Sequence, residues 1–352
     1  MNEFLLYGAY GYTGRLITRM AADYGLRPTL SGRNEEKLKA MAEEFGFPFQ
    51  TVSLEDEVAL TQLVRRFKVV LHAAGPFVRT AGAMHRACLE TGTHYLDITG
   101  EIAAFAAAQS LDAAAKAKEV MLMPGVGFDV VPTDCMAAFL KQQLPSADHL
   151  TLAFAMKGGS VSHGTAMTMV EGLGDPGAVR KNGKITPVRP AYKAREFPFV
   201  AGKKRLAVTI PWGDVFTAYY TTGIPDIETY VSSPSSQITF MKASRYLGPI
   251  LRLSVVKSFF RRKVAARPAG PTDEQRANGA AYVYGEVSNA HGEIIRARLK
   301  TPEGYTLTAI TALIVTKKVL NGEVESGYQT PAGLYGADLV LEVPGVVREV
   351  VW

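Results

Sequence analysis

Short apolar runs alternate with amphipathic stretches through the first 122 residues of this 352-residue chain. Apolar side chains three or four residues apart predict helices, as where Leu16, Ile17 and Met20 share one face. Strands are expected at residues 4–7, 28–31, 49–52, 69–72, 94–97 and 120–122, and helices at 15–24, 35–45, 56–67, 82–91 and 101–118. Because strands that alternate with helices are joined by parallel crossovers, we predict a doubly wound α/β domain at residues 1–145.

The pattern changes near residues 144–146, and the following strand candidates alternate with period two. In residues 280–288, Val283 and Val287 alternate with Tyr284 and Glu286, which is typical of a sheet with one solvated face. Strands are expected at 150–156, 205–210, 218–221, 228–231, 280–288 and 293–299, backed by helices such as 306–320. We predict a second α+β domain, on a mostly antiparallel sheet, at residues 146–330 for substrate binding or oligomerisation. Residues 331–352 are a candidate segment for a return to the first domain.

Glycines stand where the first expected strand passes into the first expected helix. Gly8 permits a tight turn, Gly11 lets the backbone approach a pyrophosphate, and Gly14 lets the helix pack closely on the strand. The helix N-terminus directs its N–H groups and the positive end of its dipole at the phosphates. The pattern predicts a dinucleotide-binding Rossmann domain, with the cradle formed by Gly8, Tyr10, Gly11, Tyr12, Thr13 and Gly14.

The end of the second expected strand indicates which dinucleotide is bound. NAD sites normally place Asp or Glu there to bind the ribose 2′-hydroxyl, whereas this chain has Ser31, Arg33 and Asn34 and no carboxylate. A guanidinium, a hydroxyl and the nearby Lys37 suit a 2′-phosphate. We therefore predict NADP(H) as the cofactor, with Ser31, Arg33, Asn34 and Lys37 binding it. The alternative is that Arg33 is a solvated turn residue.

Other segments follow expected parallel strands at the edge where ligands of such sheets bind. Ala74, Gly75 and Pro76 follow the fourth strand and are expected to form a wall near the ribose and the nicotinamide. His72, at the end of that strand, is expected to be a hydrogen-bonded core histidine.

Carboxyl groups at the same edge are candidate proton donors, because burial raises a carboxyl pKa toward neutrality. We place Asp129 first, followed by Asp97 and Glu101. Each has a structural alternative, since acids at such turns often cap helices. His163, in a glycine-rich loop of the second domain, is a further catalytic candidate, although a loop histidine is more often structural.

Motifs that resemble one protein family run from end to end of the chain, at residues 8–14, 31–34, 73–77, 95–101, 127–134, 270–276 and 327–332. With them the chain resembles the saccharopine dehydrogenase-like oxidoreductases, and within these the proteins grouped with the trans-acting enoyl reductases. The resemblance implies a Rossmann domain with a second α/β domain, NADP(H) binding and reductase activity. The length of 352 residues looks too short for the substrate domain of a true saccharopine reductase, so that substrate is not carried over.

Composition is that of an ordinary globular protein, with 47% hydrophobic residues. Cys88 and Cys135 lie in apolar helical patterns and are expected to be reduced core residues. No apolar run is long enough to span a membrane, and the glycine turn comes too early to leave room for a signal peptide, so a cytoplasmic location is expected. We expect no metal, because His, Cys and carboxylates do not cluster at ligand spacing.

The net charge of +6 is unevenly distributed. Residues 240–263 contain no acid, and their cations, interleaved with apolar side chains, are Lys242, Arg245, Arg252, Lys257, Arg261, Arg262 and Lys263. A helix of this composition can lie in a membrane interface. The alternative is an amphipathic helix of the second domain with a solvated basic face, interrupted near Pro249. Nucleic acid is not an expected partner, because no recognised binding fold surrounds the segment.

Together these features predict an NADPH-dependent oxidoreductase that reduces a C=C or C=N bond of a small or lipid-like substrate by hydride transfer. The sequence is compatible with two further associations, which are peripheral membrane contact through residues 240–263 and a homodimer. The alternative is a non-catalytic NADP(H)-binding sensor or scaffold, which would bind the cofactor without turnover.

Overall fold

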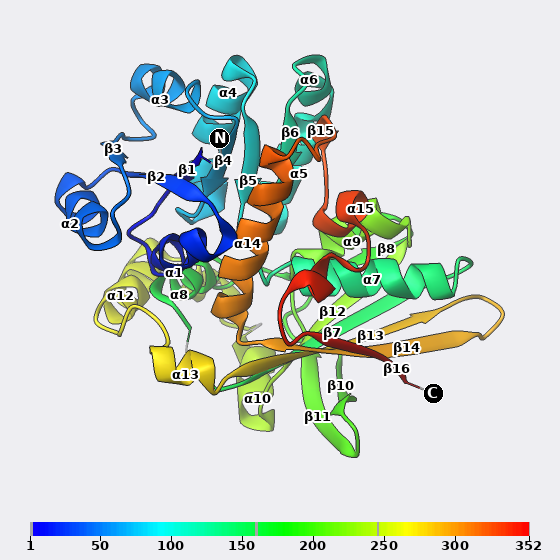
Figure 1. Cartoon of the computed structure of the whole chain (residues 1–352). Coiled ribbons are helices and arrows are strands. Elements are labelled where there is room, and N and C mark those ends of the chain that lie inside the picture. Colours follow the sequence, from blue (N-terminus) through cyan, green and yellow to red (C-terminus); the bar gives the residue numbers. More distant parts are fainter. Residues whose placement is uncertain (1–2, 159–160, 245, 352) are drawn as a thin grey trace. The chain divides into compact units, whose positions relative to one another are not determined.

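The computed structural model describes residues 3–158, 161–244 and 246–351 (Figure 1). It divides into two compact units. Unit 1 holds the residues up to Val131 together with Tyr305–Leu334, and unit 2 holds Pro132–Gly304 together with the residues from Tyr335 onward. Each unit has its own sheet.

The described part of unit 1 contains a seven-stranded sheet in the order β15-β6-β5-β4-β1-β2-β3, with every pair parallel. The strands are β1 (Glu3–Tyr7), β2 (Arg27–Gly32), β3 (Phe49–Thr51), β4 (Val69–His72), β5 (His94–Asp97), β6 (Met121–Met123) and β15 (Gly327–Tyr328). The order reverses between β1 and β4, which is the switch point of a doubly wound sheet. The predicted fold class is confirmed, and β15 is a strand that the sequence pattern did not predict.

The helices of unit 1 are α1 (Tyr12–Met20), η1 (Ala21–Tyr24), α2 (Glu35–Phe45), α3 (Glu57–Val64), α4 (Phe77–Thr91), α5 (Ile102–Ser110), α6 (Asp112–Ala117), α14 (Gly304–Leu320) and α15 (Pro331–Tyr335), which ends at the first residue of unit 2. Two differ from expectation. The helix expected at 101–118 is divided at Leu111, whose φ of −94° and ψ of 4° lie outside the helical region. Helix α4 begins at Phe77 rather than near residue 82, directly after the N-cap Pro76.

The helix expected at 306–320 to back the second domain is α14 of unit 1 (Figure 1). Thr311 Oγ1 donates to the carbonyl of Val126, and Thr308 Oγ1 accepts from the N–H of Phe128. Buried residues lie all along α14, because its sequence is apolar on every side before Lys317. The segment that returns to the first unit is therefore Tyr305–Leu334, whereas the residues from Tyr335 onward, expected to return with 331–352, belong to unit 2.

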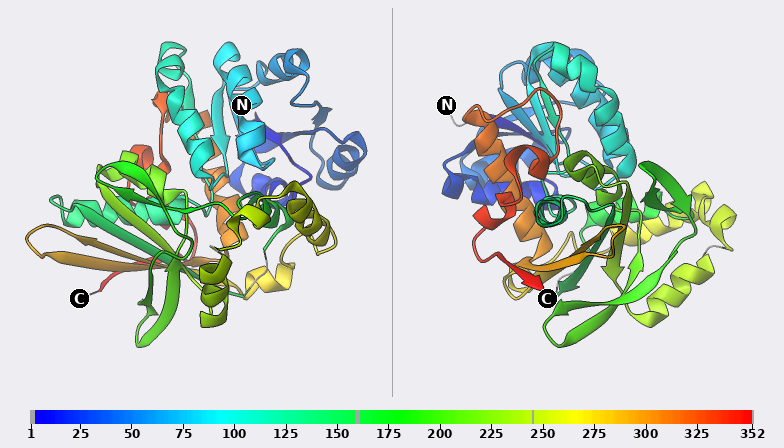
Figure 2. Two further views of the ribbon diagram at one scale, coloured as in Figure 1. Left: turned by 180° about the vertical axis from the view of Figure 1, so that it is seen from behind. Right: turned by 90° about the vertical axis from the view of Figure 1, so that its right-hand side faces the viewer.

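The described part of unit 2 contains a nine-stranded sheet in which β12 and β7 are parallel and the other pairs antiparallel. Its strands are β7 (His149–Lys157), β8 (Gly177–Lys181), β9 (Lys184–Val188), β10 (Ala194–Val200), β11 (Lys203–Thr209), β12 (Asp226–Ser232), β13 (Ala280–Ser288), β14 (Ile294–Pro302) and β16 (Val347–Val351). The path runs β10-β11-β12-β7-β13-β14-β16, with β8 and β9 attached at β12. The long β13–β14 hairpin is visible in both views of Figure 2.

The helices of unit 2 are α7 (Val131–Gln143), α8 (His163–Glu171), α9 (Asp214–Thr222), α10 (Ser235–Ser244), α11 (Gly248–Leu251), α12 (Ser254–Ala265), α13 (Asp273–Ala277) and η2 (Leu339–Glu342). The strand expected at 218–221 is wrong, because these residues belong to α9. The rings of Phe216 and Tyr220 stack 5.0 Å apart at helical spacing. Gly223, with φ of +70°, ends the helix. Helix α9 packs against β12 and β8, and this tertiary packing overrides the strand preference of tyrosine and threonine.

Candidate functional site

The turn between β1 and α1 leaves no room for side chains at two of its glycines. Gly8 has φ of +86°, and a Cβ there would lie 2.8 Å from Ala74 N and Cβ. A Cβ at Gly14 would lie 2.4 Å from the Gly8 carbonyl oxygen. Helix α1 therefore begins close against the end of β1, and the loops that follow β1 and β4 touch at the switch point.

The N-terminus of α1 is suited to a phosphate. Its N-cap is Gly11, which has no side chain to occupy the first turn, and that turn contains no acidic residue. An uncapped N-terminus attracts anions through its N–H groups and dipole. The Tyr12 ring packs edge-on against the Tyr305 ring at 5.1 Å. The sequence pattern did not indicate Tyr305, because α14 reaches this turn only through the fold.

The end of β2 presents fewer free donors than the sequence suggested. Ser31 is buried, and its Oγ donates to the Gln50 carbonyl at 2.8 Å, so its hydroxyl hydrogen is already used. Asn34 is the N-cap of α2 and accepts from the N–H of Lys37 at 2.9 Å. Arg33 is exposed and makes no hydrogen bond or ion pair with any described residue. The cations of Arg33 and Lys37 therefore remain for a 2′-phosphate.

Tyr10 lies between these two parts of the cradle. A Cβ at Gly32 would lie 2.6 Å from Tyr10 Cε1, so the ring covers that glycine. The ammonium of Lys37 lies 5.7 Å from the centre of the same ring. Tyr10 thus joins the glycine turn to the end of β2, where the adenosine ribose of a dinucleotide is bound in this fold.

Ala74, Gly75 and Pro76 follow β4 and lead into α4. Thr80 Oγ1 donates to the Ala74 carbonyl at 2.7 Å, which fixes this loop. Glu101 accepts from the N–H groups of Phe77 at 3.0 Å and Val78 at 2.9 Å. The carboxylate thus caps the start of α4 from the loop after β5, which supports its structural alternative.

Asp97 is a buried carboxyl whose oxygens are occupied by neighbouring donors. Its Oδ1 accepts from the N–H groups of Thr99 and Gly125, both at 2.9 Å, and its Oδ2 accepts from Tyr95 Oη at 2.7 Å. Burial raises its pKa to about 6. The side chain ties together the loops after β5 and β6, which is a structural role.

Asp129 differs from both of these acids because its carboxyl makes no hydrogen bond with any described residue. It lies against Gly100, where a Cβ would be 2.7 Å from Asp129 Oδ2. Burial, followed by the charge of Glu101, raises its pKa to about 7. A carboxyl of this pKa is present in both protonation states near neutrality, as a general acid requires.

His163 belongs to unit 2, whereas Asp97, Glu101 and Asp129 occupy adjoining loops of unit 1. It begins α8, and its N–H donates to the Ala269 carbonyl at 2.9 Å. Its ring Nε2 contacts the carbonyl oxygen of Arg267. These bonds attach α8 to the chain after α12, which favours the structural alternative for this histidine.

His72 is a buried histidine, as expected, but only one of its two ring nitrogens has a hydrogen-bond partner in the described part of the chain. Its Nδ1 lies 3.3 Å from Tyr95 Oη, while its Nε2 has no partner among the described residues. Burial and the neighbouring His85 lower the pKa of His72 to about 3, so the ring is neutral. Since the Tyr95 hydroxyl donates to Asp97, His72 Nδ1 carries the proton in this arrangement. The resulting chain from His72 to Asp97 links the ends of β4 and β5.

Removal of the Asp97 carboxyl should destabilise unit 1. Asp97→Ala leaves two buried N–H groups and the Tyr95 hydroxyl without their acceptor, and we expect the free energy of unfolding to fall by about 3 kcal/mol. Asp97→Asn keeps one acceptor oxygen and should cost less. Urea unfolding followed by circular dichroism measures both variants, and an Asp97→Ala protein as stable as the parent would contradict the proposed tie.

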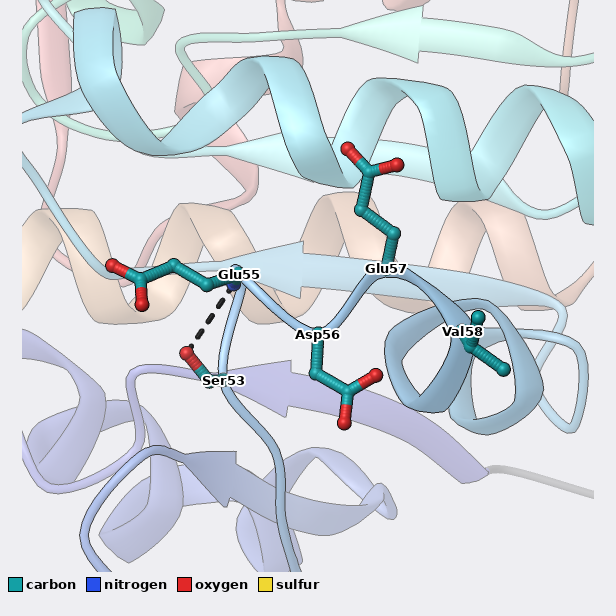
Figure 3. A pocket seen from close by; sticks show the side chains of 5 residues that line it. All are labelled: Ser53, Glu55, Asp56, Glu57 and Val58. Carbon is teal, nitrogen blue, oxygen red and sulfur yellow. Dashed lines mark hydrogen bonds between the residues drawn. The ribbon is translucent and has the colours of Figure 1, made fainter.

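A surface hollow between β3 and α3 is lined by Ser53, Glu55, Asp56, Glu57 and Val58 (Figure 3). Asp56 caps α3 by accepting from the N–H of Ala59 at 3.0 Å, and Glu57 pairs with Arg86. Carboxylates repel phosphate, so this hollow does not suit the cofactor. In the described part of the chain, no group of three or more His, Cys, Asp or Glu residues is arranged to hold a metal ion.

Comparison with known proteins bears directly on the first unit. Residues 4–123 match the family model of the saccharopine dehydrogenase NADP binding domain. A saccharopine dehydrogenase-like oxidoreductase of Rattus norvegicus is 26% identical over 214 residues, which cover 53% of this chain and 50% of that protein. A trans-acting enoyl reductase of Mycobacterium ulcerans is 31% identical over 144 residues, covering 38% of this chain and 34% of that protein. The chain thus spans about half the length, or less, of the curated relatives that it matches.

A saccharopine dehydrogenase (L-Glu forming) from Saccharomyces cerevisiae has a similar structure, with a TM-score of 0.69 and 13% identity over 100% of both chains. At this identity the likeness shows the fold alone. The matched domain confirms NADP(H) as the cofactor and confirms the resemblance drawn from the motifs: the chain carries, at residues 4–123, an NADP binding domain of the saccharopine dehydrogenase family.

Proposed function

We propose that the chain is an NADPH-dependent reductase of a C=C or C=N double bond and that Asp129 is its proton donor. One observation carries the proposal. Asp129 is a carboxyl with a pKa raised to about 7, free of hydrogen bonds to described residues, at the sheet edge where such folds bind their ligands. The neighbouring acids, Asp97 and Glu101, are engaged by backbone N–H groups.

The residues of unit 1 fit the cofactor. The backbone from Gly11 to Thr13 would hold the pyrophosphate, and Arg33 and Lys37 would bind the 2′-phosphate. Ala74 to Pro76 would border the ribose and nicotinamide. When bound, NADPH supplies a hydride, which carries the two electrons of the reduction.

Asp129 would supply the proton that the reduction requires in addition to the hydride. Asp129 would give its carboxyl proton to the atom of the double bond that does not receive the hydride, and the pair of electrons of that bond would form the new bond to the proton. The resulting carboxylate regains a proton from water. Gly100 makes space for the carboxyl, and the bonds of Asp97 and Thr308 to residues 125–128 hold the loop that carries it.

The name of the mycobacterial relative supports testing the C=C bond of α,β-unsaturated carbonyl compounds first, with cyclic imines as the second class. We expect NADPH absorbance to decay in the presence of the protein and one of these classes, in proportion to protein concentration. Tight NADPH binding without decay for either class would contradict the proposal and favour the sensor or scaffold. A homodimer and a cytoplasmic location stay predictions.

A further inference from the structure

Large apolar side chains are exposed on α11, on α12 and in the two-residue link between them. The exposed fractions are 54% for Ile250, 56% for Leu253, 77% for Val255 and 53% for Phe259. Exposed apolar residues that occur singly need no explanation, but a contiguous group marks an interaction surface.

The two faces of α12 differ in their contacts. On the inner face, Val264 is buried in a cluster with Ala166 and Val170 of α8. From the same face, Arg261 donates two hydrogen bonds to the Glu171 carboxylate, and Lys257 donates to the Glu171 carbonyl. These contacts attach α12 to its own unit and account for the inner face alone.

The outer face of α12 carries Val255, Phe259, Arg262 and Lys263, whose spacings of three, four and eight residues place them side by side. All four are exposed. Arg262 makes no hydrogen bond or ion pair with any described residue, and Lys263 Nζ lies 4.7 Å from the centre of the Phe259 ring. Apolar groups and cations therefore occupy one face, which the packing of unit 2 does not use.

The segment of sequence that carries this face has charged residues of one sign. Residues 229–272 contain eight Lys or Arg residues and no Asp or Glu, and these eight exceed the net charge of +6, so the rest of the chain is net negative. Arg245, one of the cations noted in the sequence, lies outside the described residues. A local positive charge on a protein otherwise negative favours an anionic partner.

We propose that the outer face of α12, together with the exposed Ile250 and Leu253 that precede it, docks on an anionic lipid surface. Val255 and Phe259 enter the boundary between head groups and acyl chains, while Arg262 and Lys263 bind lipid phosphates. Helices with mixed apolar and cationic faces bind in this way without crossing the bilayer. Among the described helices none is long and apolar enough to cross a membrane. The proposal does not depend on the reductase activity.

Sedimentation with vesicles tests the proposal on the full chain. The protein should sediment with vesicles of phosphatidylcholine and phosphatidylserine at low salt, and less with phosphatidylcholine alone or at high salt. Each cation near an anionic surface contributes about 1 kcal/mol, so the Arg262→Gln/Lys263→Gln variant should bind about 30-fold more weakly. Val255→Ser/Phe259→Ser should also weaken binding, because less apolar area enters the interface.

Two control variants distinguish binding through the outer face from a general effect of removing positive charge. Lys181→Gln/Lys184→Gln removes the same charge from the exposed ends of β8 and β9, and Arg261→Gln removes a cation from the inner face of α12. Both should retain most of the binding, and circular dichroism should show that every variant is folded. An absence of binding to phosphatidylserine vesicles, or an equal loss in the Lys181/Lys184 control, would overturn the proposal. Dimerisation abolished by Val255→Ser/Phe259→Ser, without vesicle binding, would assign the face to a second copy of the chain instead.

Discussion

Asp129→Asn should lower turnover by roughly a hundredfold or more while leaving NADPH affinity unchanged. The amide occupies the same space against Gly100 but cannot release a proton at neutral pH. Stopped-flow or steady-state decay of NADPH measures turnover, and fluorescence titration measures affinity. Turnover equal to that of the parent would remove Asp129 from the chemistry and return attention to Glu101 and Asp97.

The pH dependence provides a second readout of the same residue. The carboxyl acts in its protonated form, which predominates below its pKa of about 7. The parent value of kcat/KM should therefore be constant at lower pH and fall about tenfold per pH unit above pH 7, and this limb should disappear in Asp129→Asn. Glu90→Gln is a matched control, because Glu90 is exposed near the opposite end of α4 from the site.

Arg33→Ala should remove most of the preference for NADPH over NADH. A charge-assisted bond to phosphate contributes about 1.5–3 kcal/mol, so the ratio of the two dissociation constants should change roughly ten- to a hundredfold. Arg33 is exposed and unpaired among the described residues, so its guanidinium is available without breaking another bond. NADH affinity should change little, because NADH lacks the 2′-phosphate.

Lys39→Ala serves as the control for charge, since Lys39 is an exposed cation of α2. Its NADPH preference should match that of the parent. Ser31→Ala should also keep the preference, because the Ser31 hydroxyl hydrogen is already donated to Gln50. Equal affinity of the parent protein for NADPH and NADH would contradict the role of Arg33 directly.

Patterns of neighbouring residues were sufficient to predict the parallel strands and the glycine turn of unit 1. The apolar runs predicted strands in parallel order, and the glycines at positions 8, 11 and 14 predicted the turn, because both depend on neighbours within a few residues. In unit 2 the period-two pattern predicted most of the sheet. It was wrong for α9, where aromatic and β-branched residues are helical because the helix packs on the sheet.

Long-range structure decided which candidate acids are free. Asp97, Glu101 and Asp129 all stand at the end of an expected strand or in the loop that follows one. Only in the folded chain does Asp97 meet Gly125 and Glu101 meet Phe77 and Val78, while Asp129 meets Gly100, which has no side chain or donated N–H for it. Burial in the folded chain raises the pKa of Asp97 and of Asp129.

The doubly wound sheet, the glycine cradle, the absence of an acid at the end of β2 and the acid-free basic segment 240–263 could all be recognised in the sequence alone. Tertiary structure alone decided that α14 and β15 belong to unit 1, that the Ser31 hydroxyl is occupied and that Val255 and Phe259 face outward with Arg262 and Lys263. The two kinds of feature differ in how far apart in the chain the residues that decide them lie. Backbone preference and periodicity depend on nearby residues, whereas burial and hydrogen-bond partners depend on segments far apart in the chain that meet only after folding.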